Sequence, residues 1–388
     1  DTDIELARFQ NQPKRVLILD ACTPTPDQDS GSLRMLNLMQ ILKDLGYQVS
    51  FIPENMAHFN QYTTHLQQLG VECVYGPKFK TPIDYLKTKG QVFNLVILSR
   101  YYVAKPLMSS IRSYCKNATL WFDTVDLHYL REQRMAEIST DPQLIKSANT
   151  TKQHELAVAE ACDLTLVVSP YEKDVLAKEL PRLKVDVLSN IHEIFGNKNT
   201  FENRQDIMFI GGYQHTPNVD GLLWFVEEIF PLICQSIPLI KLHVIGSKAP
   251  QKIIDLGQHP NIEFHGFVEN IDPFMETIKV AVAPLRFGAG VKGKVNMSMS
   301  HGQPVVGTKV AVEGMYTTHE KDVMMADEPE AFAQSVVKLY QDEQLWNQVS
   351  KGGLENVKQW FSFDAAKAQI TKLLNQSTDQ DKNTPNIK

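Results

Sequence analysis

A glycine-rich turn with two lysines follows a buried apolar run in the segment VAVAPLRFGAGVKGK (residues 280–294). Gly288 and Gly290 let the backbone approach a phosphate group closely, and Lys292 and Lys294 supply positive charge. We expect a helix to begin near Lys294, so that the unpaired N–H groups of its first turn also point at the anion. The segment therefore predicts a phosphate-binding site.

Two nucleotide-binding motifs match this turn in part. Its three glycines satisfy G-x-G-x-x-G, and Glu313 follows at roughly the distance of a ribose-binding acid, but no further domain follows to hold a second substrate. The turn also matches the start of a P-loop, yet Val295 stands where a P-loop needs Ser or Thr to hold magnesium. A tight turn with solvated lysines is the structural alternative, and the paired lysines favour the phosphate site.

The elements that position this turn follow a regular alternation of short apolar runs and helical stretches, which indicates parallel sheets with helices on both faces. A polar segment without apolar periodicity, residues 191–206, divides the pattern into two halves. The strands that we expect lie at residues 16–21, 48–52, 71–75, 94–99, 119–123, 164–169 and 185–190 in the first half, and at 207–212, 242–246, 262–267, 280–285 and 304–308 in the second.

The sequence thus predicts an α/β protein of two Rossmann-like, doubly wound domains. We assign residues 1–195 to the first domain, 196–373 to the second, and 374–388 to a polar tail or linker, with the last helix packing back on the first domain as an option. Ligands of such sheets bind beyond the carboxyl ends of the strands, so the active site is expected in the cleft between the domains.

Composition narrows the choice of partners and compartment. The 388 residues have a net charge of −6 and a pI near 6.0, which gives no general attraction for nucleic acid. Five scattered cysteines suggest neither a disulfide framework nor a zinc site, and no signal peptide or membrane-spanning run is seen. We expect a cytoplasmic protein. Because the chain begins with Asp, it is also expected to be a fragment, with fusion to further domains left open.

Several segments taken together resemble the retaining family-4 glycosyltransferases of the GT-B fold. FIGGYQHTPNVDGLLWF, GFVENI, the glycine-rich turn and PVVGTKVAVEGM match its C-terminal half in order and spacing, and LDACTPTPDQDSGSLRMLNLMQILKDLGYQV matches the opening of its N-terminal half. The resemblance covers nearly the whole chain. It implies a retaining hexosyltransferase that moves a sugar from a UDP-, GDP- or dTDP-sugar to an acceptor hydroxyl.

The segment WFDTVDLHYLREQR is similar to members that build bacterial surface polysaccharides such as lipopolysaccharide, which implies a glycan or a lipid-linked oligosaccharide as the acceptor. In those proteins this segment is a strand-end loop that faces the cleft. For His128, a structural imidazole held by Asp126 is an equally acceptable interpretation. Peripheral contact with the inner face of the membrane, through the last amphipathic helix, also stays open.

The resemblance carries site roles to particular residues. It implies catalytic roles for Asp126, His128 and Lys294, and acceptor contacts for Ser30, Gly31, Arg34 and Arg131. The donor-binding residues that it implies are Gly211, Gly212, His215, Phe267, Val268, Gly288, Gly290, Lys292, Lys294 and Glu313.

Two features depart from the family pattern. The paired glutamates usual in the donor loop are missing, with Met297 at one position and a residue near Ala289 at the other. In addition, the GGYQHTPN loop lacks the basic residues often found there, so Lys292 and Lys294 must neutralise most of the diphosphate charge.

The same sequence also bears on metal dependence and on alternative functions. The three Asp-x-Asp matches, at residues 1–3, 27–29 and 379–381, are poorly placed for a metal-dependent transferase, so we expect no metal and no cofactor beyond the nucleotide sugar. The alternatives are a nucleotide-sugar epimerase of the same fold and a catalytically inactive nucleotide-sugar-binding module. An NAD-dependent dehydrogenase is more remote.

Overall fold

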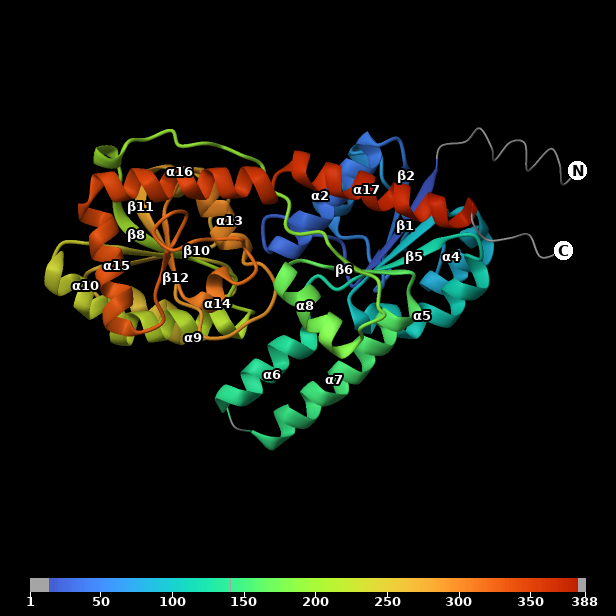
Figure 1. Ribbon diagram of the computed structural model, residues 1–388, viewed down its shortest axis with the longest axis horizontal. Helices are drawn as coiled ribbons and strands as arrows, with labels where there is room; N and C mark the ends of the chain where they lie inside the picture. Colours follow the sequence, from blue (N-terminus) through green and yellow to red (C-terminus); the bar gives the residue numbers. More distant parts are fainter. Residues whose placement is uncertain (1–13, 140, 383–388) are drawn as a thin grey trace, which may run out of the picture.

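The computed structural model describes residues 14–139 and 141–382, which form two parallel sheets in separate α/β domains (Figure 1). The first sheet has the strand order β3-β2-β1-β4-β5-β6-β7. Its strands are β1 (Arg15–Asp20), β2 (Gln48–Pro53), β3 (Glu72–Cys73), β4 (Leu95–Ser99), β5 (Thr119–Asp123), β6 (Leu164–Val167) and β7 (Val185–Val187).

The second sheet has the order β10-β9-β8-β11-β12-β13. Its strands are β8 (Gln205–Ile210), β9 (Leu242–Ile245), β10 (Ile262–Gly266), β11 (Ile278–Ala283), β12 (Val305–Gly307) and β13 (Met324–Met325). Every strand pairing is parallel, which confirms the predicted fold class of two parallel-sheet α/β domains. Strand β13, only two residues long, was not predicted.

Helices cover both faces of each sheet (Figure 1). Those of the first half are α2 (Ser30–Asp44), α3 (Asn60–Gln68), α4 (Pro82–Lys89), α5 (Tyr101–Tyr114), α6 (His128–Ser139), α7 (Pro142–Ala161) and α8 (Pro170–Glu179). The second half contains α9 (Thr216–Trp224), α10 (Phe230–Ser236), α11 (Gln251–Ile254), α12 (Asp272–Thr277), α13 (Gly293–Ser300), α14 (Lys309–Val312), α15 (Pro329–Gln341), α16 (Glu343–Trp360) and α17 (Phe363–Lys382).

Each sheet is apolar on both faces because its strands are buried on both sides. In β1, Val16 and Ile18 join one hydrophobic cluster, whereas Leu17 and Leu19 join the cluster on the other face. This assignment follows from the two-residue side-chain period of a strand. The four faces of the two sheets therefore give four main clusters, two in each domain.

The chain crosses between the domains twice, and the two crossings lie side by side. The N–H of His192, on the way into the second domain, donates to the carbonyl of Phe361 at 2.7 Å, and His192 forms a parallel bridge with Ser362 on the way back. Helix α17 then returns to the first domain, where Ile370 and Leu373 complete the cluster that includes α2. Figure 1 shows α17 lying along α2.

Helix α17 corrects the predicted polar tail at residues 374–388. The helix continues to Lys382, and Leu374 is only 9% exposed within the N-terminal cluster. Its apolar residues recur at helical spacing, so the apolar stripe outweighs the polar composition of the sequence around it. Residues 383–388 of that tail lie outside the described residues.

Helix α6 differs from the strand-end loop that the sequence predicts at this point. Two buried carboxylates from distant segments accept hydrogen bonds from the backbone at its start. Glu172 accepts from the N–H of Leu127 at 3.0 Å, and Glu155 accepts from those of His128 and Tyr129 at 3.3 and 3.1 Å. Negative groups satisfy and stabilise a helix N-terminus, so the helix begins where these carboxylates fix it.

Arg34 also requires a correction, because its predicted acceptor contact is incompatible with its position. The side chain is 1% exposed and forms an ion pair of 2.7 Å with Asp123, which is fully buried at the end of β5. Its remaining bonds run to the carbonyls of Leu188 and Ser189. Arg34 therefore joins α2, β5 and the end of β7 inside the domain rather than facing the cleft.

We predict that Arg34→Ala lowers the free energy of unfolding of the first domain by about 3–5 kcal/mol, because it leaves the buried carboxylate of Asp123 without its cationic partner. Urea unfolding followed by circular dichroism measures the change. The matched control is Arg112→Ala, whose pair with Asp163 is more than 40% exposed on both sides and should cost less than about 1 kcal/mol. Equal costs for the two variants would contradict the prediction.

Candidate functional site

The order of the second sheet fixes where a ligand can bind. The loops after the neighbouring strands β8 and β11 leave in opposite directions, because β9 and β10 lie on one side and β12 and β13 on the other. Such a switch point opens a crevice at the carboxyl ends of the strands. Gly211 and Gly212 follow β8, and the glycine-rich turn at residues 284–292 follows β11. Both predicted donor segments therefore meet at this crevice.

Lys294 joins the two donor segments directly. Its ammonium donates to Oδ1 of Asn218 at 2.5 Å and lies 4.4 Å from the ring centroid of Phe209, and the amide of Asn218 donates to the carbonyl of Gly212 at 2.7 Å. A Cβ on Gly211 would lie 2.8 Å from the Lys294 ammonium, so only glycine fits there without displacement. The loop after β8 and the first turn of α13 therefore form one unit.

Lys292 is held by its own turn. Its ammonium donates to the carbonyls of Ala289 and Gly290 at 3.1 and 2.6 Å. Gly290 has φ of +69°, a left-handed conformation that glycine adopts without strain. The turn therefore folds around the lysine that was predicted to bind phosphate.

The two lysines are electrostatically unusual. Burial lowers the pKa of Lys294 to about 7, and the charge of Lys292 acts in the same direction. Burial also lowers the pKa of Lys292 to about 8, against the opposing influence of Glu313 and Glu172. Within the part of the chain that the structure describes, both ammonium groups hydrogen-bond only neutral oxygens. An anion bound here would give both ammonium groups the directly hydrogen-bonded negative partner that neither has among these residues.

The first domain closes over this crevice from the opposite side. A Cβ on Gly293, the first residue of α13, would lie 2.3 Å from Cβ of Ser30, the first residue of α2. A Cβ on Gly212 would likewise approach the carbonyl of Gln28 to 3.7 Å. Two helix N-termini thus face each other across the domain boundary, and both favour negative charge between them. Of the predicted acceptor residues, Ser30 lies at this contact, whereas Gly31 faces Val125 and Arg100 of its own domain.

Asp126, His128 and Arg131 form a charged group on the first domain. Arg131 donates to Asp126, and Nδ1 of His128 lies 3.5 Å from carboxylate oxygens of both Asp126 and Glu155. A Cβ on Gly290 would lie 3.0 Å from Cβ of Asp126, which places this group against the donor turn of the other domain. The structure therefore brings these predicted residues together with Lys292.

The pKa shifts in this group follow from its charges. Burial raises the pKa of Asp126, but Arg131, His128 and Arg100 together bring it below its ordinary value. Burial lowers the pKa of His128, but Asp126 and Glu155 bring it above its ordinary value. At neutral pH Asp126 is therefore ionised, and the imidazole of His128 is stabilised as a cation.

Arg134 was missed by the sequence reasoning. Its guanidinium, on α6 of the first domain, donates to both carboxylate oxygens of Glu313 at 2.8 and 2.9 Å and to the carbonyl of Gly288 at 2.6 Å. Glu313, predicted to bind the donor, is thus held in a two-bond ion pair between the domains. The sequence did contain an indication of this role. Arg134 follows Arg131 by three residues, so in a helix the two side chains lie on the same face.

Three other predicted donor residues lie around the crevice. His215 is the N-cap of α9, and its pKa is lowered by burial and by Arg131 and Lys294, which places it among the groups of both domains. Phe267 is 51% exposed just after β10, the edge strand, and Val268 packs on the cluster beneath it. A nucleotide base at Phe267 would therefore lie outward from the switch point, and these roles remain predictions.

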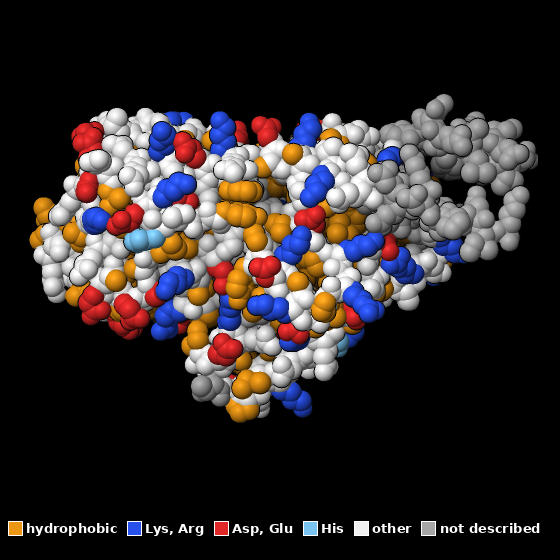
Figure 2. Space-filling view, in the orientation of Figure 1, with side chains coloured by type: hydrophobic (Ala, Val, Ile, Leu, Met, Phe, Trp, Pro, Cys, Tyr) orange, Lys and Arg blue, Asp and Glu red, His pale blue; other side chains and the backbone are white. Residues whose placement is uncertain are grey.

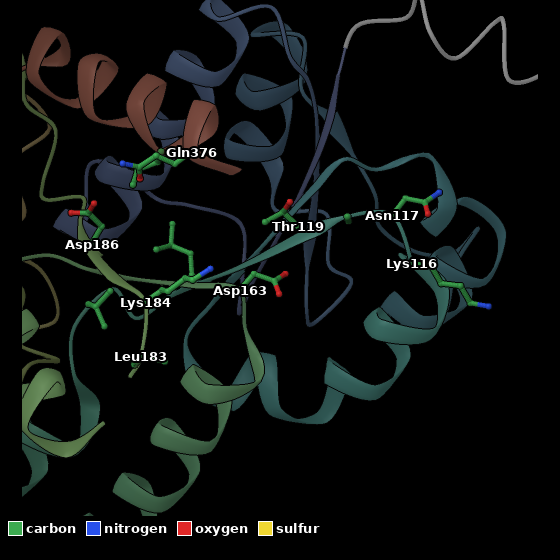
Figure 3. Close-up of a pocket in the computed structure, with 12 residues that line it drawn as sticks. Lys116, Asn117, Thr119, Asp163, Leu183, Lys184, Asp186 and Gln376 are labelled. Atoms are coloured by element: carbon green, nitrogen blue, oxygen red, sulfur yellow. The ribbon is translucent and has the colours of Figure 1, made fainter. Parts of the chain in front are cut away.

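A hollow of about 840 Å³ lies at the opposite edge of the first sheet (Figure 3). Figure 3 shows Thr119, Asp163 and Lys184 around it, at the starts of β5, β6 and β7, with Gln376 of α17 above. Because ligands of parallel sheets bind at the carboxyl ends of the strands, this hollow is not the candidate site.

Neither sign of charge dominates the face of the molecule shown in Figure 2. Figure 2 shows basic and acidic side chains interspersed over both domains on the face in view. Hydrophobic side chains appear at the tip of the α6–α7 projection, where Ile138 and Ile145 are 50% and 48% exposed. Among the described residues, none of the helices combines the length and apolar character that a membrane crossing requires.

Comparison with solved structures places the fold in a known class. The chain superimposes on TarM with a TM-score of 0.74 at 10% identity, over 94% of this chain and 98% of that one. It superimposes on sucrose-phosphate synthase from Thermosynechococcus elongatus with a TM-score of 0.69 at 15% identity, over 95% and 100%. Anabaena HepE in complex with UDP and glucose gives 0.69 at 14% identity, over 94% and 100%. The protein has the GT-B fold.

The second domain also matches a sequence family. Residues 204–342 match the family described as glycosyl transferases group 1. A stretch of 140 residues is 26% identical to an uncharacterized 44.6 kDa protein in the cps region of Klebsiella pneumoniae, and the match spans 34% of this chain and 36% of that relative. The family segment includes β8, the glycine-rich turn and Glu313, so it contains the donor side of the candidate site.

We predict that Arg134→Ala loosens the closed arrangement of the domains, because it removes the two-bond pair with Glu313 and the bond to Gly288. Small-angle X-ray scattering without ligand should show a larger radius of gyration. Arg286→Ala is the control, since its pair with Asp220 lies within the second domain. Superimposable scattering curves for wild type and Arg134→Ala would contradict this role.

Proposed function

We propose that the protein is a glycosyltransferase that transfers a sugar from a nucleoside-diphosphate donor to an acceptor hydroxyl, with retained configuration at the anomeric carbon. The observation that supports this most is the pair of lysines at the switch point of the second sheet. Lys292 is the N-cap of α13 and Lys294 lies in its first turn. Among the described residues, their ammonium groups donate hydrogen bonds only to neutral oxygens. A diphosphate suits such a site in charge and position.

The proposed chemistry breaks the bond between the anomeric carbon and the diphosphate oxygen and forms a bond from that carbon to the acceptor oxygen. Negative charge develops on the leaving diphosphate, where Lys292, Lys294 and the N–H groups of α13 stabilise it. The acceptor proton passes to an oxygen of the departing diphosphate, so no protein nucleophile is needed. Because fixed cations do this work, we propose that transfer does not require a metal ion.

Asp126, His128 and Arg131 lie on the acceptor side of the donor turn, and we assign them to the reacting end of the site. Asp126, ionised at neutral pH, would stabilise positive charge that develops on the sugar ring, while His128 and Arg131 hold its carboxylate in place. Ser30, which lies beside Gly293, and Gly31 next to it in the chain would contact the acceptor.

The acceptor class rests on similarity. The Klebsiella relative is described by its place in the cps region, and TarM in complex with α-GlcNAc-glycerol and UDP is a structural neighbour. Together with the resemblance of WFDTVDLHYLREQR, these support a glycan or glycolipid acceptor in surface polysaccharide synthesis. Because HepE was solved in complex with UDP and UDP-glucose, UDP is the first nucleoside diphosphate to test.

Lys294→Ala is expected to weaken nucleoside diphosphate binding about 10–100-fold, because it removes a charge-assisted bond to the diphosphate. Isothermal titration calorimetry with UDP, GDP and dTDP, without added metal, measures the loss and identifies the base. Lys309→Ala is the control, since that lysine is 80% exposed and pairs with Asp327. If Lys294→Ala binds as tightly as the control, the diphosphate does not lie at this loop.

The affinity should also depend on pH. Lys294 has a lowered pKa of about 7 in the free protein, and a bound diphosphate raises it. Below pH 7 the lysine is already protonated and binding is tightest. As the pH rises from 7.5 to 9, binding must return a proton to Lys294, and this lysine alone should raise the Kd by up to about tenfold per pH unit.

The Lys294→Arg variant is the matched control for this pH dependence, because arginine stays charged over the whole range. It should remove the part of the dependence due to Lys294 and leave that of Lys292, whose pKa is lowered to about 8. Calorimetry in two buffers of different ionisation enthalpy would detect the proton uptake. An affinity that is constant from pH 7.5 to 9 in the wild type would contradict the proposed electrostatics.

Product analysis separates the proposal from its two alternatives. A transferase releases nucleoside diphosphate only when an acceptor is supplied. An epimerase converts the donor sugar without an acceptor, and an inactive module binds the donor and releases nothing.

A further inference from the structure

Two histidines and one glutamate come together in the second domain, away from the donor turn. Glu263 and His243 are register partners on the adjacent parallel strands β10 and β9, so their side chains lie on the same face of the sheet. His265 follows Glu263 by two residues and shares that face. The register shifts between Phe264 and Gly266, an irregularity of the kind that re-aims a side chain near a site.

The ligand atoms of these side chains converge. Nδ1 of His243 lies 2.9 Å from Nε2 of His265 and 3.5 Å from Oε2 of Glu263, and Nε2 of His265 lies 3.9 Å from that oxygen. A tetrahedral ion with bonds of about 2.0–2.1 Å separates its ligands by about 3.3 Å. The three distances bracket this value, so small side-chain rotations would bring all three atoms to one ion.

The far nitrogen of His243 has the partner that a metal-binding histidine needs. Nε2 of His243 lies 3.5 Å from a carboxylate oxygen of Asp206, on the neighbouring strand β8. If Nε2 carries the proton for this bond, Nδ1 presents its lone pair toward His265 and Glu263. A carboxylate behind a ligating imidazole fixes the tautomer and strengthens the ligand.

The surroundings limit access without closing the site. The side chains of His243 and His265 are 14% and 26% exposed, and the ring of Phe274 on α12 lies edge-on against both imidazoles. Lys241 donates to Oε1 of Glu263, and its side chain is 49% exposed, so it can leave when an ion arrives. An ion can therefore reach the site from the side of Lys241, and the ring of Phe274 shields the imidazoles from water on another side.

From this geometry we propose that His243, Glu263 and His265 bind a divalent transition-metal ion, with zinc the ion best suited to two imidazoles and one carboxylate. Water completes the fourth position. The ion joins the edge strand β10 to β9, and β10 leads into Phe267. His243, Glu263 and His265 are not among the residues that form the lysine-containing donor turn, so the ion is proposed to stabilise the second domain and to take no part in sugar transfer.

The test uses the full chain, purified with a tag that contains no histidine and freed of metal by chelation. Zinc is titrated in competition with a chromophoric zinc indicator, and cobalt is added separately to record its visible absorption. We expect one ion per chain, tetrahedral cobalt bands, and a rise in Tm of about 5 °C at a hundredfold excess of zinc over Kd.

Single variants locate the site. His265→Ala and Glu263→Gln should each weaken zinc binding at least tenfold, and Asp206→Asn about 10–100-fold through its effect on His243. His65→Ala, on the exposed face of α3, is the matched histidine control and should change nothing. Circular dichroism and nucleoside diphosphate binding check that each variant is folded.

The proposal is overturned if zinc does not bind below about 100 µM, or if His265→Ala and Glu263→Gln bind it as tightly as His65→Ala. Loss of nucleoside diphosphate binding after chelation would also contradict it, because the two sites are proposed to be independent.

Discussion

Positive charge confined between two domains is the constraint on which this structure depends. Lys292 and Lys294 lie at a switch point, at a helix N-terminus that faces the first domain, and burial lowers the pKa values of both toward neutrality. Such an arrangement is unfavourable on its own and becomes favourable when an anion enters. The glycines around it are needed because a side chain at Gly211 or Gly293 would occupy the space of the lysine or of the opposite helix. Anion binding and domain closure would therefore be coupled, because each changes the electrostatic environment of the same two lysines.

The sequence predicts the two sheets well because both signals are local. Buried strands appear as short apolar runs, and the phosphate turn appears as glycines and lysines next to one of them. Contacts between distant residues were not predicted. The start of α6 depends on Glu155 and Glu172, and the position of Arg34 depends on Asp123, eighty-nine residues away. Arg34 follows a Ser-Gly loop as a surface residue would, and only the buried partner reveals its structural role.

The two sides of the site differ in how they are held. On the donor side, the ammonium of Lys294 and the amide of Asn218 are fixed by hydrogen bonds within one domain. On the acceptor side, Asp126 is held by Arg131 and is brought to Gly290 only by the closed arrangement, which the pair between Arg134 and Glu313 supports. Under the proposed function, a donor would thus bind to groups held within one domain, whereas the reacting end would be completed by contact between the domains. In the proposed reaction, this order would protect the activated donor sugar from water.

Helix α17 has a consequence for biosynthesis. It is the last of the helices that the structure describes, yet Ile370 and Leu373 fill the hydrophobic cluster of the first domain beside Leu38 and Leu42. During translation the first domain emerges from the ribosome early, and the groove that receives α17 stays uncovered until the second domain has been made. The nascent chain therefore exposes an apolar surface for most of its synthesis. A chaperone that recognises such surfaces has a defined interval in which to act, and that interval ends when α17 has emerged from the ribosome and packed against the first domain.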